Sequence, residues 1–368
     1  MPSLELFTRI FLVPFIVSTL LAYAATYFVR SLYLRFHWLD DPALQRHPKV
    51  IHTYPVPRGG GLAIFTGFFL STVYFLGIDK HSLGILLGGL LLAVVGFLDD
   101  RKDLNPYLRL ILGFVAASFV VAAGIGIAFI TNPVGEGVLY LDRPQISFSL
   151  FSLQHTIWVV SDLFALIWIV WSMNMVNWSK GLDGQLPGIV VIAAVFIALL
   201  SFRFTEDVTQ WEVAILAAIT AGSYFGFLPW NFYPQKIMPG YGGGALAGYL
   251  LATLAILSGA KIAMAILVLG IPTMDAVYTI LRRIVSGRSP VWGDRGHFHH
   301  RLLDLGWSKP RVAIFYWVVS AILGIIALQL NSQQKFYTIV ALAVLVGGAL
   351  LWLNFFTSFS KQPGRGNG

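Results

Sequence analysis

The sequence predicts an all-α polytopic membrane protein, and composition and the pattern of apolar runs are the evidence. Of the 368 residues, 57% are hydrophobic and 11% are charged, and the mean hydropathy is +0.75. Soluble domains carry about 25% charged residues. The apolar residues form continuous runs close to the roughly 20 residues that one transmembrane helix needs. They do not alternate with polar residues, so we expect no strands.

Ten or eleven transmembrane helices are expected from these runs. The apolar windows cover 7–29, 61–78, 82–98, 109–130, 157–177, 186–203, 211–229, 240–259, 262–281, 312–330 and 336–358. The gaps between them are too short for a soluble domain. The first window lacks a cleavage site and is expected to stay as a helix. We therefore expect one integral-membrane domain over 1–360 and a disordered tail over 361–368.

The net charge of +8 indicates orientation rather than a nucleic-acid partner. Lys and Arg are enriched in cytoplasmic loops of membrane proteins. With the N-terminus placed outside, only Arg9, Lys80, Arg143, Arg203, Lys261 and Lys335 of the 25 basic residues fall on the outer side. The polar loops are therefore expected at the cytoplasmic face of the cell membrane. The chain has no cysteine, which excludes disulfides and thiolate metal sites.

The first two polar loops on that side carry residues suited to an anion and a cation. Arg58 precedes Gly59-Gly60-Gly61, and a glycine-rich backbone can approach an anion closely. The alternative is a flexible loop whose charges only set topology. Asp99 and Asp100 end an apolar window, and Mg²⁺ is commonly held by one or two carboxylates together with substrate phosphates. The alternative is a solvated helix end.

The next two loops add amides, a carboxylate and further glycines. Asn174 and Asn177 lie three residues apart and thus on one helix face. With Asp183 they could bind a nucleobase or sugar and help to ligate a metal, or they could simply cap the helix and begin a turn. The run Gly240 to Gly244 is either an anion site at a helix N-terminus or a site of close helix packing.

The last polar segment follows an acidic residue inside an apolar window. Asp275 is expected to pair with Arg282, which lies seven residues further along the helix. Beyond it, Gly287 to Arg301 contains three arginines and three histidines. Such a density of basic groups either fixes topology or binds an anion.

In order and spacing, these motifs resemble the polyprenyl-phosphate N-acetylhexosamine-1-phosphate transferases, glycosyltransferase family 4, from about residue 40 to residue 315. The resemblance is carried by Pro55 to Gly60, Gly96 to Asp100, Asn174 to Gly184, and Asp275 through His297-Phe298-His299-His300. The histidine stretch, followed by Leu305-Gly306, is closer to the N-acetylglucosamine-1-phosphate branch than to the peptidoglycan-precursor branch.

The resemblance implies transfer of a sugar phosphate from a UDP-N-acetyl sugar to undecaprenyl phosphate, with release of UMP and with Mg²⁺ or Mn²⁺ as cofactor. It also implies a groove for the isoprenoid chain, an early membrane step in envelope polysaccharide synthesis, and a possible homodimer. The implied catalytic and metal-binding residues are Asp99, Asp100 and Asp183. The implied substrate-binding residues are Arg58, Asn174, Asn177, Lys180, Arg282, Arg295, His297, His299 and His300.

Two positions depart from the family pattern. Lys180 stands where the family has a carboxylate, and Tyr241 stands where it has a metal-binding aspartate. Lys180 could neutralise the diphosphate directly, or Asp103, Asp275 or Asp294 could serve as replacement ligands. A third alternative is a non-catalytic relative that binds lipid phosphate or nucleotide sugar. A transporter or flippase is less favoured, because its polar groups would lie near the bilayer midplane within inverted repeats.

Overall fold

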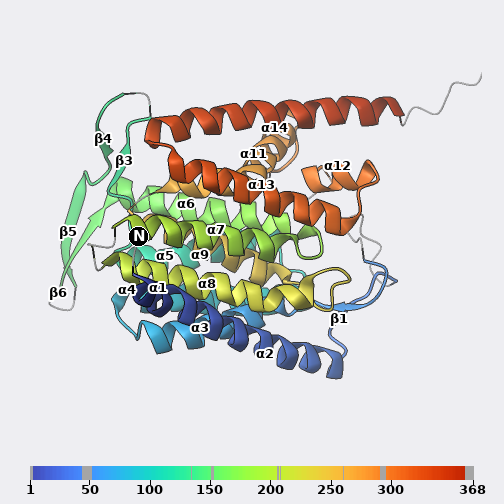
Figure 1. Ribbon diagram of the computed structural model, residues 1–368, viewed down its shortest axis with the longest axis horizontal. Coiled ribbons are helices and arrows are strands. Elements are labelled where there is room, and N and C mark those ends of the chain that lie inside the picture. The colour runs from blue at the N-terminus through green and yellow to red at the C-terminus, as the bar shows by residue number, and fades with distance from the viewer. Residues whose placement is uncertain are drawn as a thin grey trace, which may run out of the picture.

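The computed structural model describes residues 3–43, 52–133, 135–150, 153–204, 207, 209–259, 261–290 and 296–360. Within these ranges, seven helices are long and apolar enough to cross a membrane, and an eighth span results if one bent pair is counted. The prediction of an all-α polytopic membrane protein is confirmed. Figure 1 shows most of the long helices running side by side as a bundle.

Every predicted apolar window contains a helix. The first span joins α1 (Leu4–Phe7), the π-helix η1 (Thr8–Leu12) and α2 (Val13–Arg35). The other helices are α3 (Gly60–Phe75), α4 (Lys80–Lys102), α5 (Pro106–Ala122), α6 (Val159–Trp178), α7 (Gln185–Ser201), α8 (Thr209–Asn231), α9 (Gly240–Leu257), α10 (Ile262–Val268), α11 (Gly270–Val285), α12 (Phe298–Asp304), α13 (Lys309–Gln329) and α14 (Ser332–Ser360). Short 3₁₀ turns η2 (Ser179–Gly181) and η3 (Phe202–Phe204) follow α6 and α7. Three helices, α3, α5 and α7, are shorter than a full span.

The expectation that the chain has no strands is wrong. Three antiparallel hairpins form: β1 (Leu39–Asp40) with β2 (Val56–Pro57), β3 (Phe129–Thr131) with β4 (Val138–Tyr140), and β5 (Gln145–Leu150) with β6 (Leu153–Trp158). The expected helix 109–130 stops early because Gly124 adopts a φ of +91°, a left-handed conformation that commonly terminates helices. Apolar residues beyond it therefore continue into β3.

The window 262–281 is broken rather than continuous. Helices α10 and α11 meet at an angle of 88°. Pro272 lies in the first turn of α11, where its missing N–H removes a hydrogen bond that a continuous helix would make. The break turns α11 away from α10, and the last turn of α11 carries Arg282 and Arg283.

Glycines bring three helices into backbone contact near the polar end of the bundle. A Cβ atom on Gly96 of α4 would overlap Gly242 of α9, and one on Gly61 of α3 would overlap Gly243. Such close approach is the usual role of small residues between membrane helices. It places the C-terminus of α4 against the N-terminus of α9. Figure 1 shows β1 and α12 at this end of the bundle and β3 to β6 at the opposite end.

Candidate active site

A buried carboxylate at the end of α4 is held by an arginine from the next helix. Asp99 is 0% exposed, and Nη1 of Arg109 in α5 lies 3.0 Å from its Oδ1 and 3.1 Å from its Oδ2. The backbone N–H of Leu104 donates to the same Oδ1 at 3.1 Å. Asp99 therefore fixes the connection between α4 and α5 as well as lying at the polar end of the bundle.

The neighbouring carboxylate, Asp100, has different partners. Its Oδ1 lies 3.5 Å from Nε of Arg58 and accepts a hydrogen bond of 3.2 Å from the backbone N–H of Tyr241. The Arg58 guanidinium also reaches Asp40 at 3.7 Å and Asp103 at 3.6 Å. Burial lowers the pKa of Arg58, but Asp100, Asp40 and Asp103 outweigh burial and the net shift is upward. Arg58 thus links the β1–β2 hairpin to α4 as a permanent cation.

Lys180 lies close to these acidic residues without pairing with either of them. Its Nζ is 5.7 Å from the centroid of the Tyr241 ring, and Cζ of Arg109 is 5.1 Å from the same ring. Tyr241 also donates through its hydroxyl to the carbonyl of Arg109 at 3.4 Å. In the part of the chain that the structure describes, Lys180 forms no ion pair within 4.0 Å. It nevertheless interacts electrostatically with Asp99, Asp100, Arg58 and Arg109.

The segment around Lys180 presents two amides and a third carboxylate. Asn174 donates to the carbonyl of Val170 at 2.8 Å, whereas Oδ1 of Asn177 is buried beside Gly244 and has no hydrogen-bond partner. Asp183 is 1% exposed. It accepts from the N–H of Gln235 at 3.3 Å and lies 3.7 Å from Nζ of Lys309.

The histidine cluster packs against the other side of the same segment. Nδ1 of His297 lies 2.8 Å from Asp275, and the N–H of Phe298 donates to Asp275 at 2.9 Å. The expected pair of Asp275 with Arg282 is therefore wrong: α12 approaches α11 from the side, and His297 reaches the carboxylate. The His297 ring lies 5.7 Å from the rings of both Trp178 and His299.

His299 faces the segment that carries Lys180. Its Nε2 is buried, has no hydrogen-bond partner and points at Gly181, where a Cβ atom would overlap it. Burial, together with His300 and His297, lowers the pKa of His299 well below its usual value, so the ring is neutral at pH 7. His300 is buried beside it, with ring centroids 4.3 Å apart.

The remaining predicted arginines occupy the connection between α11 and α12. Arg282 lies against Gly296, because a Cβ atom there would overlap the guanidinium. Arg295 is outside the described residues. Arg282 is therefore placed beside the histidine cluster, whereas the predicted position of Arg295 stays a prediction.

The structure thus brings Arg58, Asp99, Asp100 and Lys180 together, with Asn177 and His299 next to the segment that carries Lys180. Asp183 instead contacts Gln235 and Lys309. Sequence reasoning missed the roles of Arg109 and Lys309, which pair with Asp99 and Asp183. In the sequence, both belong only to the basic residues of the predicted cytoplasmic side. Arg109 lies one helix away from its partner, and Lys309 is 126 residues from Asp183 in the chain, so no local spacing signals either pair.

The carboxylates that the structure describes, which do not include Asp294, form no site for a divalent metal ion. Among the described residues there is no group of three or more Asp, Glu or His side chains arranged to hold a metal. Both oxygens of Asp99 contact Arg109, whereas Asp100 contacts Arg58 and the Tyr241 N–H through Oδ1 alone. Oδ1 of Asp183 is buried without a hydrogen bond, 3.7 Å from Nζ of Lys309. Lys180, Arg58 and Arg109 would repel a dication at this centre and oppose its attraction to Asp99 and Asp100. The expectation of Mg²⁺ or Mn²⁺ stays a prediction, and the described residues contain no group of ligands that fits either ion.

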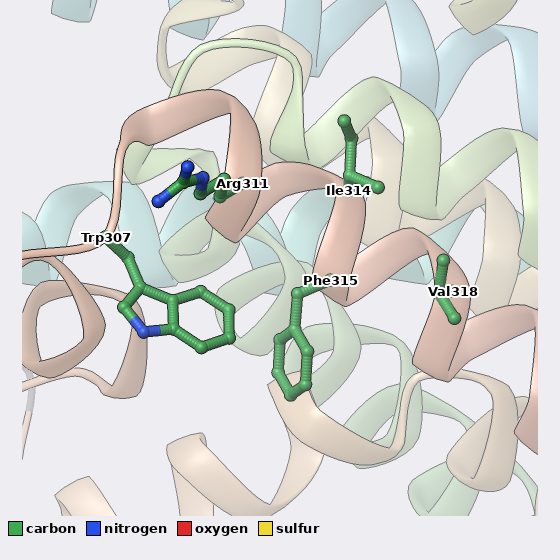
Figure 2. A pocket seen from close by; sticks show the side chains of 5 residues that line it. All are labelled: Trp307, Arg311, Ile314, Phe315 and Val318. Carbon is green, nitrogen blue, oxygen red and sulfur yellow. The ribbon is translucent and has the colours of Figure 1, made fainter.

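Two apolar grooves open on the helix bundle. One, of about 280 Å³, is lined by Leu110, Phe114, Ile167, Val170, Trp171, Asn174, Trp178, Ile280 and Pro290. The other, of about 450 Å³, is lined by Trp307, Arg311, Ile314, Phe315 and Val318, and Figure 2 shows the rings of Trp307 and Phe315 on one side of α13. Only the first contains a predicted site residue, Asn174.

Comparison with known proteins gives consistent matches. The family model described as "Glycosyl transferase family 4" matches residues 82–259. A decaprenyl-phosphate N-acetylglucosaminephosphotransferase of Mycolicibacterium smegmatis is 30% identical over 346 residues, covering 85% of this chain and 79% of the relative. A probable undecaprenyl-phosphate N-acetylglucosaminyl 1-phosphate transferase of Bacillus subtilis is 27% identical, with 91% and 88% coverage. A phospho-N-acetylmuramoyl-pentapeptide-transferase of Caldanaerobacter subterraneus is 28% identical, with 72% and 81% coverage.

Proposed function

Because the chain belongs to glycosyl transferase family 4, we propose that it transfers N-acetylglucosamine-1-phosphate, or a related N-acetylhexosamine-1-phosphate, from a UDP-sugar to undecaprenyl phosphate. Its relatives in this family include polyprenyl-phosphate N-acetylglucosamine-phosphate transferases. The other product is UMP. The reaction would be the first membrane step of a cell-envelope polysaccharide.

The observation that carries this proposal is the convergence of charged groups at one end of the helix bundle. Arg58 precedes α3, Asp100 ends α4, Arg109 lies in α5 and Lys180 follows α6. Arg109 and Lys180 lie over the ring of Tyr241 at the start of α9, Asp100 accepts from the Tyr241 N–H, and Arg58 pairs with Asp100. Transfer between two phosphate groups requires two anions to approach, so fixed positive charge that neutralises them dominates catalysis.

The reaction needs one bond to form and one to break. An oxygen of the lipid phosphate attacks the sugar-bearing phosphorus of the UDP-sugar, and the bond from that phosphorus to the bridging oxygen breaks. The electron pair leaves with UMP, so negative charge grows on the UMP phosphate. In this proposal the cations of the cluster stabilise that charge, while Asn177 and Asp183 bind the nucleotide sugar.

The apolar groove that contains Asn174 is suited to the isoprenoid chain. Its wall comes from α5, α6 and α11. Trp178 at its edge contacts His297, so the groove leads toward the charged end of the bundle. A lipid lying in this groove would keep its chain in the membrane and present its phosphate to the cluster.

The location proposed for the reaction is the cytoplasmic face of the cell membrane. Arg58 of the charged cluster pairs with Asp40 of β1, and Figure 1 shows β1 and α12 at the same end of the bundle. In this proposal the UDP-sugar is supplied from the cytoplasm, so the polar end of the bundle would face the compartment that holds the substrate.

A non-catalytic binding protein is the second candidate. It is favoured by one observation, namely that Asp99, Asp100 and Asp183 are all occupied by cations. The two candidates differ in turnover but not in binding of a nucleotide sugar.

Purified protein in nanodiscs tests the proposal. It is supplied with undecaprenyl phosphate and UDP-N-acetylglucosamine, with Mg²⁺, with Mn²⁺ or with EDTA, and UMP and lipid-linked sugar are quantified. Equal amounts of both products, dependent on the lipid phosphate, support the transferase. Saturable nucleotide-sugar binding without UMP under all three conditions supports the binding protein instead.

A further inference from the structure

We propose that the Lys180 ammonium is the phosphate-binding cation of this site, and that sugar-phosphate transfer proceeds without a divalent metal ion. The inference rests on the proposed function and identifies the group that neutralises the diphosphate. The chemistry recognised is a phosphate or diphosphate oxygen, which either the nucleotide sugar or the lipid phosphate could supply.

The first step of the argument is that the acidic residues already have their own cations. Arg109 contacts both oxygens of Asp99, and Arg58 lies 3.5 Å from Asp100. Arginine remains protonated in proteins, so these pairs persist over the whole working pH range. Lys180 is thus not needed to neutralise either carboxylate.

The second step is that Lys180 is positioned by an aromatic ring and not by an ion pair. Its Nζ lies over the Tyr241 ring, a cation–π arrangement that orients an ammonium while leaving its N–H donors available. Lys180 forms no ion pair in the ranges that the structure describes. An incoming anion would therefore find a positioned ammonium group that interacts with Asp99 and Asp100 at longer range but has no ion pair within 4.0 Å among the described residues.

The third step is that unpartnered polar atoms lie on both sides of Lys180. Oδ1 of Asn177, in the turn before it, and Nε2 of His299, against Gly181, are both buried without a hydrogen-bond partner. Oδ1 of Asp183, three residues after Lys180, is a third such atom. Buried polar atoms are normally satisfied, so this concentration of unpartnered atoms around one lysine supports a polar ligand. The amide oxygen can accept from a hydroxyl or N–H of that ligand.

The fourth step concerns the metal alternative. A divalent ion at Asp99 would have to displace the Arg109 guanidinium from both carboxylate oxygens. Asp100 could offer it Oδ2, because Oδ1 is the oxygen that contacts Arg58 and the Tyr241 N–H. The ion would also lie in the field of Lys180, Arg58 and Arg109. With Lys180 supplying the charge at the leaving UMP phosphate, the step described above balances without a proton, an oxidant or a metal.

The activity test compares wild type with Lys180→Met, Lys180→Arg and Lys180→Asp in EDTA and in Mg²⁺. Wild-type UMP release should differ by less than about twofold between the two conditions. Lys180→Met keeps most of the side-chain length but not the charge. Its rate of UMP release should fall about 100-fold, as expected when a donor to developing charge is removed. Lys180→Arg should recover part of that loss, and Lys102→Ala, an exposed lysine at the end of α4, should match wild type.

A binding test gives a second readout. Thermal stabilisation is measured in EDTA with inorganic diphosphate, with UDP, and with undecaprenyl phosphate in separate samples, since a ligand that binds only the folded state raises Tm. Loss of the diphosphate and UDP shifts in Lys180→Met, with the lipid shift kept, assigns Lys180 to the nucleotide sugar. The reverse pattern assigns it to the lipid phosphate. Electron paramagnetic resonance of Mn²⁺ should show bound metal only in Lys180→Asp.

Failure of the inference and failure of the proposed function give different results. A wild-type rate that falls more than about tenfold in EDTA and returns with Mg²⁺, together with Mn²⁺ bound to wild type, overturns the inference and leaves the transferase intact. Unchanged diphosphate, UDP and lipid shifts in a folded Lys180→Met variant also overturn it. No UMP in any condition, with metal-free UDP binding that depends on Lys180, overturns the transferase and keeps Lys180 as the phosphate-binding cation.

Discussion

The carboxylate of Asp275 lies 2.8 Å from Nδ1 of His297, and both side chains are more than nine-tenths buried. Asp275 is in α11, whereas His297 immediately precedes α12, so this pair and the adjoining Phe298 N–H bond fasten the two helices together. Through His297 the pair also positions the ring of His299, which stacks on it and faces Gly181.

Asp275→Asn should destabilise the protein and slow turnover together. Asparagine has one acceptor oxygen where aspartate has two, so it cannot accept from both His297 and the Phe298 N–H, and a buried donor left unsatisfied costs about 1–3 kcal/mol. We expect a lower Tm in detergent and a lower rate of UMP release. The double variant Asp275→Asn/His297→Gln serves as the control: if its Tm equals that of the single variant, the two residues are coupled, whereas additive losses would contradict the pairing.

Asp99→Asn and Asp100→Asn should both abolish UMP release but should differ in stability. Asp99 accepts three hydrogen bonds within the protein, so its loss leaves Arg109 without a partner and lowers Tm. Asp100 accepts one backbone hydrogen bond and a longer contact from Arg58, so its variant should stay closer to wild-type Tm. Activity assays and thermal unfolding of both variants check this. Wild-type turnover in either one removes that residue from the reaction.

The sequence predicted the helices well and their contacts poorly, for a physical reason. Hydrophobic runs determine which segments enter the membrane, and each of the eleven windows holds a helix. Periodicity does not reveal a break such as that between α10 and α11, which depends on Pro272 and on Gly270 packing between Leu323 and Leu342. The hairpins lie mainly between the apolar windows, and a signal for one strand was present: Gln145 to Leu150 alternates polar and apolar residues, which is typical of a strand.

For the candidate site as well, the sequence identified several of the residues but not their contacts. Asp99, Asp100, Arg58 and Lys180 could be selected because glycines and polar residues interrupt apolar runs there. Their partners could not be selected: Arg109, Lys309 and the backbone of Tyr241 are determined by how the helices cross. The glycines Gly61 and Gly96 were noticed as loop and motif residues, but their contacts with α9 are visible only in three dimensions.

His299→Gln should make the stability of the protein less dependent on pH below about pH 6.5. The pKa of His299 is lowered in the folded protein by burial and by its two histidine neighbours, so below its unfolded pKa of about 6.5 the unfolded chain binds the proton more readily. Stability attributable to this group is therefore complete above about pH 6.5 and decreases as the pH falls, by at most about 1.4 kcal/mol per pH unit. Tm measured from pH 8 to pH 5 should fall less steeply in the variant.

The matched control for that experiment is His37→Asn. His37 is exposed and has a φ of +54°, a conformation that asparagine tolerates well. Its profile should follow that of wild type. Parallel slopes for wild type and His299→Gln would show that the buried ring does not contribute to the pH dependence.

Gly96→Ala should disrupt the bundle at the point where α4 meets α9. A Cβ atom at Gly96 would overlap the backbone of Gly242, and backbone atoms cannot rotate away as a side chain can. Overpacking of a well-packed core costs about 1–3 kcal/mol, so we expect a lower Tm. Separation of the two helices also pulls Asp100 from the N–H of Tyr241, and UMP release should fall more than stability alone explains.

Gly347→Ala in α14, where a Cβ atom has no neighbour within 4 Å, is the control and should leave both Tm and UMP release unchanged. Equal behaviour of the two alanine variants would show that α4 and α9 are not in backbone contact at this position.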